Sequence, residues 1–111
     1  MPHTDIPVLD ELVLTVVVDN ETDTLSSVDS GVAQLPEMAS LLGRIPPTRE
    51  HDGHPGICVF DQLCVACHGL SVLVTGRRGT ETRTVLFDVG PYGDVWLDNA
   101  ERLGIDLASI E

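Results

Sequence analysis

The chain has 111 residues with 42% hydrophobic content, which is enough for one small domain with a hydrophobic core and argues against a disordered chain. The 18 acidic residues outnumber six basic ones, all arginine, and the formal charge of -12 argues against nucleic-acid binding, which relies on clustered Lys and Arg. No basic, signal-like segment opens the chain, and its longest apolar run, Leu12 to Val18, is too short to cross a membrane. We therefore expect a cytoplasmic protein with reduced cysteines and neither nucleic-acid nor membrane partners.

The apolar run from Leu12 to Val18 is rich in β-branched residues and predicts a first strand, 12–20, buried on both faces. Asp19 and Asn20 follow it as polar residues suited to a strand exit.

The segment 21–63 differs from the rest, because it carries several prolines, serines and glycines. We expect a long Pro/Gly-rich insertion or loop, with order only in a short helix at 35–42 and a short extended piece at 57–63. Pro36 suits the first turn of that helix, and Gly43 suits its end.

Two further strands, 70–75 and 83–88, are predicted to form a β-hairpin within 68–90, joined by a loop at 76–82. A helix is then predicted at 94–103, capped by Asp94 and ended by Gly104 in a left-handed conformation. Its apolar stripe comprises Trp96, Leu97, Ala100 and Leu103.

The stretch from Cys64 to His68 matches the Cys-x-x-Cys-His pattern of c-type haem attachment. A haem-bearing electron carrier is therefore one alternative. Its context is unfavourable, because the residues after the motif alternate like a strand and no methionine follows as a second ligand.

A zinc-binding or interaction module is another alternative. Cys58, Cys64, Cys67 and His68 offer thiolate and imidazole ligands, and His51 with His54 could form a second pair. The competing interpretation makes Cys58 and Cys67 small buried apolar residues and leaves the two loop histidines in solvent.

An ordered set of short motifs spans about half the chain. It comprises Val18-Asp19-Asn20, His68-Gly69-Leu70-Ser71, Leu86-Phe87-Asp88-Val89-Gly90, Asn99-Ala100 and Leu103-Gly104-Ile105-Asp106. The set resembles the N-terminal portion of metallo-β-lactamase-fold hydrolases, in particular the subgroup of dihydropterin-methyl-aminobenzene ribofuranosyl phosphate synthase-like enzymes. The resemblance implies an α/β (α+β) fold over 1–111: a partial αββα sandwich with one mostly antiparallel sheet and a covering helix.

The resemblance also implies zinc or another divalent metal in the complete enzyme. The family's His-x-His-x-Asp-His ligand motif follows the strand after this helix and is absent here. We therefore expect no cofactor and no catalytic residue in this chain alone, and an enzyme only in the completed protein.

Pocket residues can still be carried over from the resemblance. Asp88 matches the family's Phe-Asp-x-Gly turn beneath the metal, where it would orient loop amides or a ligand histidine, or else only bond its own backbone. Asp19, Asn20 and His68 match positions at the pocket rim, although His68 also fits a plain strand-entry residue.

The second sheet of such a sandwich has no counterpart in these residues. An apolar sheet face and an unpaired strand edge should then remain exposed. We expect a truncated or split product that needs the missing C-terminal half of the fold, or a homodimer partner.

Overall fold

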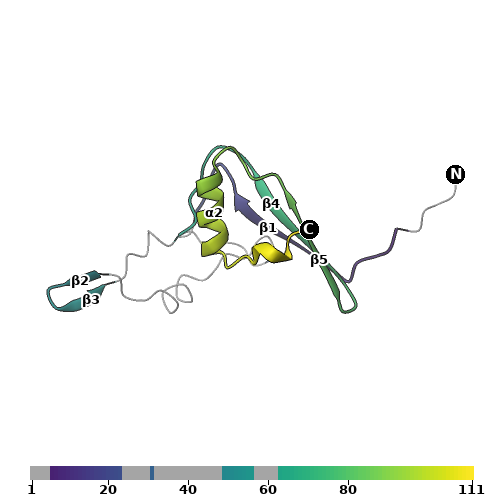
Figure 1. The fold of residues 1–111 in the computed structure, drawn as a ribbon, viewed down its shortest axis with the longest axis horizontal. Coiled ribbons are helices and arrows are strands. Elements are labelled where there is room, and N and C mark those ends of the chain that lie inside the picture. The colour runs from purple at the N-terminus through teal and green to yellow at the C-terminus, as the bar shows by residue number, and fades with distance from the viewer. Residues whose placement is uncertain (1–5, 24–30, 32–48, 57–62) are drawn as a thin grey trace.

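The computed structural model describes residues 6–23, 31, 49–56 and 63–111. Three strands form an antiparallel sheet in the order β1-β4-β5, and one helix packs on it (Figure 1). The elements are β1 (Glu11–Val18), β4 (Ser71–Arg78), β5 (Glu81–Phe87), helix α2 (Gly93–Arg102) and the short 3-10 helix η2 (Leu107–Ser109). This mixed α+β arrangement, an antiparallel sheet with a covering helix, agrees with the predicted fold class.

The β4–β5 hairpin is longer than predicted. Most of the expected loop is paired strand, with Gly76 opposite Arg83 and Arg78 opposite Glu81. The connection is a tight turn in which Gly79 has a φ of 58°. A left-handed turn residue matches the right-handed twist of the flanking strands, so the pairing continues up to the turn.

Strand β1 contains a bulge near its end. Val16 lies opposite Val72 and Val18 opposite Ser71, so Val17 is an extra residue in the ladder. A bulge bends its strand and redirects side chains. Here Val17 and Val18 are both buried in the core, 3% and 1% exposed.

The core lies between the sheet and α2. It comprises Val17, Val18, Leu73, Trp96 and Ala100, with Cys67, Leu86, Leu103, Ile105 and Ile110 packed against it. The predicted helix stripe is confirmed for three of its four residues, but Leu97 is 54% exposed and Asn99 is buried instead.

The ends of α2 differ in how well they were predicted. Asp94 lies in the first turn of the helix and not at its N-cap. The N-cap residue is Tyr92, whose side chain makes no capping hydrogen bond. Gly104, with a φ of 70°, follows the helix as predicted.

The opposite face of the sheet is apolar and open. Strand registers place seven side chains on it in adjacent rows: Leu12, Leu14, Val16, Val72, Val74, Val85 and Phe87. Five of them are 49% to 62% exposed, while Val72 and Val74 are half-buried. The prediction that the first strand is buried on both faces is therefore wrong for most of β1. Among the described elements, α2 packs on the other face and leaves this one to solvent. We call these seven residues the open face.

The insertion contains a hairpin that was not predicted. Strands β2 (Arg49–His51) and β3 (His54–Gly56) pair around Asp52 and Gly53, whose φ angles are 51° and 77°. Asp-Gly is a strong sequence signal for a hairpin turn, because both turn residues need positive φ angles. This hairpin could therefore have been predicted. Figure 1 draws this hairpin away from the main sheet. The predicted helix at 35–42 lies outside the described residues, as does all of the extended piece at 57–63 except Leu63.

Candidate functional site

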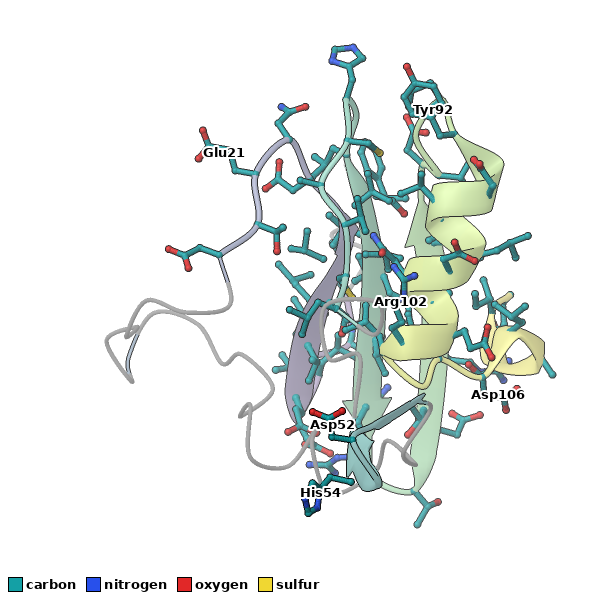
Figure 2. The ribbon with its side chains drawn as sticks, turned by 90° about the vertical axis from the view of Figure 1, so that its left-hand side faces the viewer. Glu21, Asp52, His54, Tyr92, Arg102 and Asp106 are labelled. Carbon is teal, nitrogen blue, oxygen red and sulfur yellow. The ribbon has the colours of Figure 1, made fainter. Side chains whose placement is uncertain are left out.

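The four predicted pocket residues come together at one end of the sheet. Asp19 and Asn20 follow β1, His68 precedes β4, and Asp88 follows β5. Because β4 runs antiparallel to both neighbours, its start lies beside their ends. All four residues are exposed. We call this the loop end; Figure 2 shows it at the top, between the labelled Glu21 and Tyr92.

The loops after β1 and before β4 are hydrogen-bonded to each other. The Cys67 N–H donates to the Asp19 carbonyl over 3.1 Å, and the Gly69 N–H donates to Asn20 Oδ1 over 3.1 Å. Asp19 Oδ1 in turn accepts from the Asn20 N–H over 2.7 Å. Asp19 and Asn20 thus hold the residues on both sides of His68.

Asp88 is in the left-handed region, with a φ of 57°. Its Oδ1 accepts from the Val89 N–H over 2.6 Å and from the Gly90 N–H over 3.0 Å. These two bonds stabilise the charged form and lower the pKa of Asp88. The carboxylate therefore bonds its own backbone, and it presents a permanent negative charge at the loop end at neutral pH.

The β4 and β5 loops touch at Gly69, which has a φ of 126°. A Cβ there would lie 2.8 Å from Pro91 Cδ and 3.2 Å from Gly90 Cα. The missing side chain allows this approach, which fixes the spacing between the His68 loop and the Asp88 turn.

A buried relay joins α2 to the Asp88 turn. Trp96 Nε1 donates to Ser71 Oγ over 2.9 Å, and Ser71 Oγ donates to the Asp88 carbonyl over 2.6 Å. Ser71 is fully buried and Trp96 is 7% exposed. No role was predicted for Ser71. The signal that the sequence did offer is Trp96, because the indole N–H of a buried tryptophan usually needs a hydrogen-bond acceptor.

Asn99 makes a second buried network. Its Nδ2 donates to the Val17 carbonyl and to the Val65 carbonyl, each over 2.9 Å, and its Oδ1 accepts from the Val65 N–H over 2.9 Å. The side chain thus bonds a carbonyl at the β1 bulge and ties the segment before His68 to α2. The sequence signal for this network is the position of Asn99 on the apolar side of the helix, because a buried amide requires hydrogen-bond partners.

The cysteine motif lies in irregular backbone rather than on a helix. The Cys64 thiol donates to the Asn99 carbonyl over 3.9 Å, and burial raises its pKa, against a smaller opposing effect of Arg102. Cys64 and Cys67 are both free thiols. Cys58 lies outside the described residues, as does the His51 side chain; His54 is exposed.

Within the described part of the chain, no group of three or more His, Cys, Asp or Glu side chains is placed to hold a metal ion. The same residues contain no helix long and apolar enough to cross a membrane. No protein-family model, curated protein or solved structure matches the sequence or the fold.

Proposed function

We propose that this chain forms the first, helix-covered sheet of an αββα sandwich of the metallo-β-lactamase type. A second sheet completes the sandwich and supplies the metal ligands of a hydrolase. The observation that carries the proposal is the open face, an apolar sheet surface opposite a finished core. The chain alone is inactive in this proposal.

The size of the open face supports a missing layer. With strands about 4.8 Å apart and a rise of about 3.4 Å per residue, it covers roughly 14 Å by 17 Å, or about 240 Å². At about 25 cal/mol per Å², burying it would contribute about 6 kcal/mol, comparable with the whole stability of many small domains. A domain of this size gains a great deal from covering that surface.

The charge of the chain favours a second sheet over a second copy of the chain. Two copies would combine two charges of -12 into -24, and this repulsion opposes their association. A layer of different sequence avoids this difficulty, so the missing half of the fold is the partner we propose.

The loop end is where the two layers would build the site. A bound divalent metal in the complete protein would generate a hydroxide nucleophile and polarise the scissile bond. The described residues offer no donor set for such a metal, and no step of the reaction is assigned to them. The Asp88 turn, held by Ser71 and by its own loop amides, would position groups that the second layer brings.

The test starts from the DNA downstream of the codon for Glu111, searched in every frame and in the adjacent gene for His-x-His-x-Asp-His. The encoded polypeptide is produced and combined with this chain and zinc, and hydrolysis of bis(p-nitrophenyl) phosphate is measured. We expect zinc retention and hydrolysis only in the combined sample. Absence of the motif, or metal-dependent hydrolysis by the isolated chain, would overturn the proposal.

A matched variant pair sharpens this test. Phe87→Asp changes the open face at a residue that is 62% exposed, whereas Leu97→Asp changes a residue of α2 that is 54% exposed. Phe87→Asp should abolish the combined activity while leaving the Trp96 fluorescence of the isolated chain unchanged, and Leu97→Asp should retain activity. Equal losses from both variants would contradict the assignment of the open face.

The zinc module and the haem carrier remain predictions for Cys58, Cys64, Cys67 and His68. Metal analysis and a visible spectrum of the isolated chain separate them. One tightly held zinc that is lost in Cys64→Ser would support the module, and a Soret band would support the haem carrier.

A further inference from the structure

The two histidines of the β2–β3 hairpin occupy paired positions beside its turn. His51 is the last residue of β2, His54 is the first residue of β3, and the register places them directly opposite each other. Residues directly opposite in an antiparallel pair lie on the same face, with Cβ atoms about 4.5–5.5 Å apart. The backbone of this hairpin therefore brings together two residues of a type that binds metals.

The turn between the two histidines fixes this register. Asp52 and Gly53 have φ angles of 51° and 77°, as the two central residues of a type I′ hairpin turn require. A slip by one residue would place the two histidines on opposite faces of the hairpin. A Cβ on Gly53 would meet no atom within 4 Å, so glycine is needed there for its backbone conformation alone.

The chemistry of this hairpin favours a metal cation as its ligand. The His54 side chain is exposed (Figure 2), so an ion can reach it from solvent. Histidine is the commonest metal ligand in proteins, and imidazole suits Zn²⁺, Cu²⁺ and Ni²⁺. The formal charge of -12 also attracts cations to the chain and repels anions.

We propose that His51 and His54 together bind one divalent transition-metal ion through their imidazole nitrogens, with water in its remaining coordination positions. The ion joins β2 to β3 beside the turn. Figure 1 draws this hairpin away from the main sheet, and the site uses neither the loop end nor the cysteine motif. The inference therefore stands apart from the proposed function.

A bound ion stabilises the hairpin in this proposal. The strands β2 and β3 have three residues each and form a two-stranded sheet of their own. A two-stranded hairpin is marginally stable in water. An ion that binds only the paired histidines shifts the equilibrium toward the paired state. Because only two protein ligands hold the ion, it exchanges with solvent and is lost on desalting, unlike zinc in the completed hydrolase.

Nickel is the probe for this site, because imidazole suits Ni²⁺ whereas thiolates favour zinc and Cu(I). The full chain, with its thiols reduced, is titrated with Ni²⁺ alone by calorimetry, and NMR line broadening of the Gly53 amide locates the ion. His51→Gln and His54→Gln each remove one ligand. Gly53→Val keeps both histidines but strains the turn, because a β-branched residue avoids a φ of 77°. The matched controls are His68→Gln and Asp52→Asn, which keeps the turn as Asn-Gly.

We expect one Ni²⁺ per chain, and at least tenfold weaker binding in His51→Gln, His54→Gln and Gly53→Val. Asp52→Asn and His68→Gln should bind within twofold of the parent chain. With Zn²⁺, which is diamagnetic, amide exchange in the hairpin should slow at least threefold in the parent chain and not in His54→Gln. Unchanged binding in Gly53→Val, or loss of binding in His68→Gln, would overturn the proposal. Neither result bears on the proposed function, which is tested by hydrolysis in the combined sample.

Discussion

The two faces of the sheet differ in how completely they are built. Under α2, apolar packing is combined with Ser71, Thr84 and Asn99, buried polar residues that have hydrogen-bond partners. No buried side-chain polar atom in the described residues lacks a partner. The open face has seven apolar side chains in contiguous rows, most of them exposed. The comparison shows a core that is complete in its details beside a surface that is prepared for burial.

The difference between the two faces also shows which of them determines the positions of the loops. Apolar contacts tolerate many partners of suitable shape, whereas a buried amide or hydroxyl is satisfied in few arrangements. The covered face therefore fixes the positions of the Asp88 turn and the His68 loop, and the open face adds area without adding directional bonds. Four measurements test this difference between the two faces.

The largest effect is expected from Asn99→Leu, a change of similar volume. It would leave the Val17 carbonyl and both main-chain groups of Val65 without their side-chain partner. We expect a loss of about 3–5 kcal/mol in the free energy of unfolding, measured by urea denaturation. Asp98→Ala, an exposed change on the same helix, serves as the control. A loss below about 1 kcal/mol would show that these bonds do not secure the covered face.

The second prediction compares the loss of stability caused by truncating a leucine on each of the two faces. Leu73→Ala removes a core side chain that is 7% exposed, whereas Leu14→Ala removes one that is 62% exposed on the open face. In the isolated chain we expect losses of about 2–4 kcal/mol for Leu73→Ala and under about 0.5 kcal/mol for Leu14→Ala. Equal losses in urea denaturation would mean that the open face is already covered in solution.

Ser71→Ala should give an intermediate effect. The Trp96 indole N–H loses its acceptor, and the Asp88 carbonyl loses its donor. We expect a loss of about 1–3 kcal/mol, together with a shift in Trp96 fluorescence. Ser109→Ala removes an exposed hydroxyl bond from the last residue of η2 to the Asp106 carbonyl and should leave the fluorescence unchanged.

The smallest effect concerns the charge of Asp88. Its folded pKa is lowered below the ordinary value of 3.8 by the Gly90 and Val89 amides. The stabilisation is therefore fully present above the unfolded pKa and is lost as the pH falls through the folded pKa. Urea midpoints measured from neutral pH down into that acid range should fall less steeply for Asp88→Asn than for the parent chain. Identical slopes would show that the two loop bonds make no contribution.

Much of the fold could be predicted because its signals are local. The β-branched run of β1, the alternation in β4 and β5, and Gly104 after α2 each follow from neighbouring residues. An exposed apolar sheet face was also predicted, from the absence of a second-sheet counterpart. The convergence of Asp19, Asn20, His68 and Asp88 agrees with the strand order.

The errors have a different origin. The apolar residues of β1 show what that strand could bury, but not whether a second layer is present to cover it. Leu97 was placed in the helix stripe and Asn99 was not, because hydrophobicity does not reveal that a bulge would leave a carbonyl to be bonded. Ser71 was missed for another reason: its partner, Trp96, lies 25 residues away in the sequence.

The Asn99 network has a consequence for the order of folding. Its bonds to Val17 and Val65 span 82 and 34 residues. Contacts this distant in sequence form slowly, because long loops must close before any interaction is gained. During synthesis on a ribosome, β1 must wait with its apolar side chains unprotected until α2 has emerged, even after the β4–β5 hairpin has paired. The nascent chain is therefore most prone to aggregation until α2 has emerged, and a chaperone would be most useful at that stage.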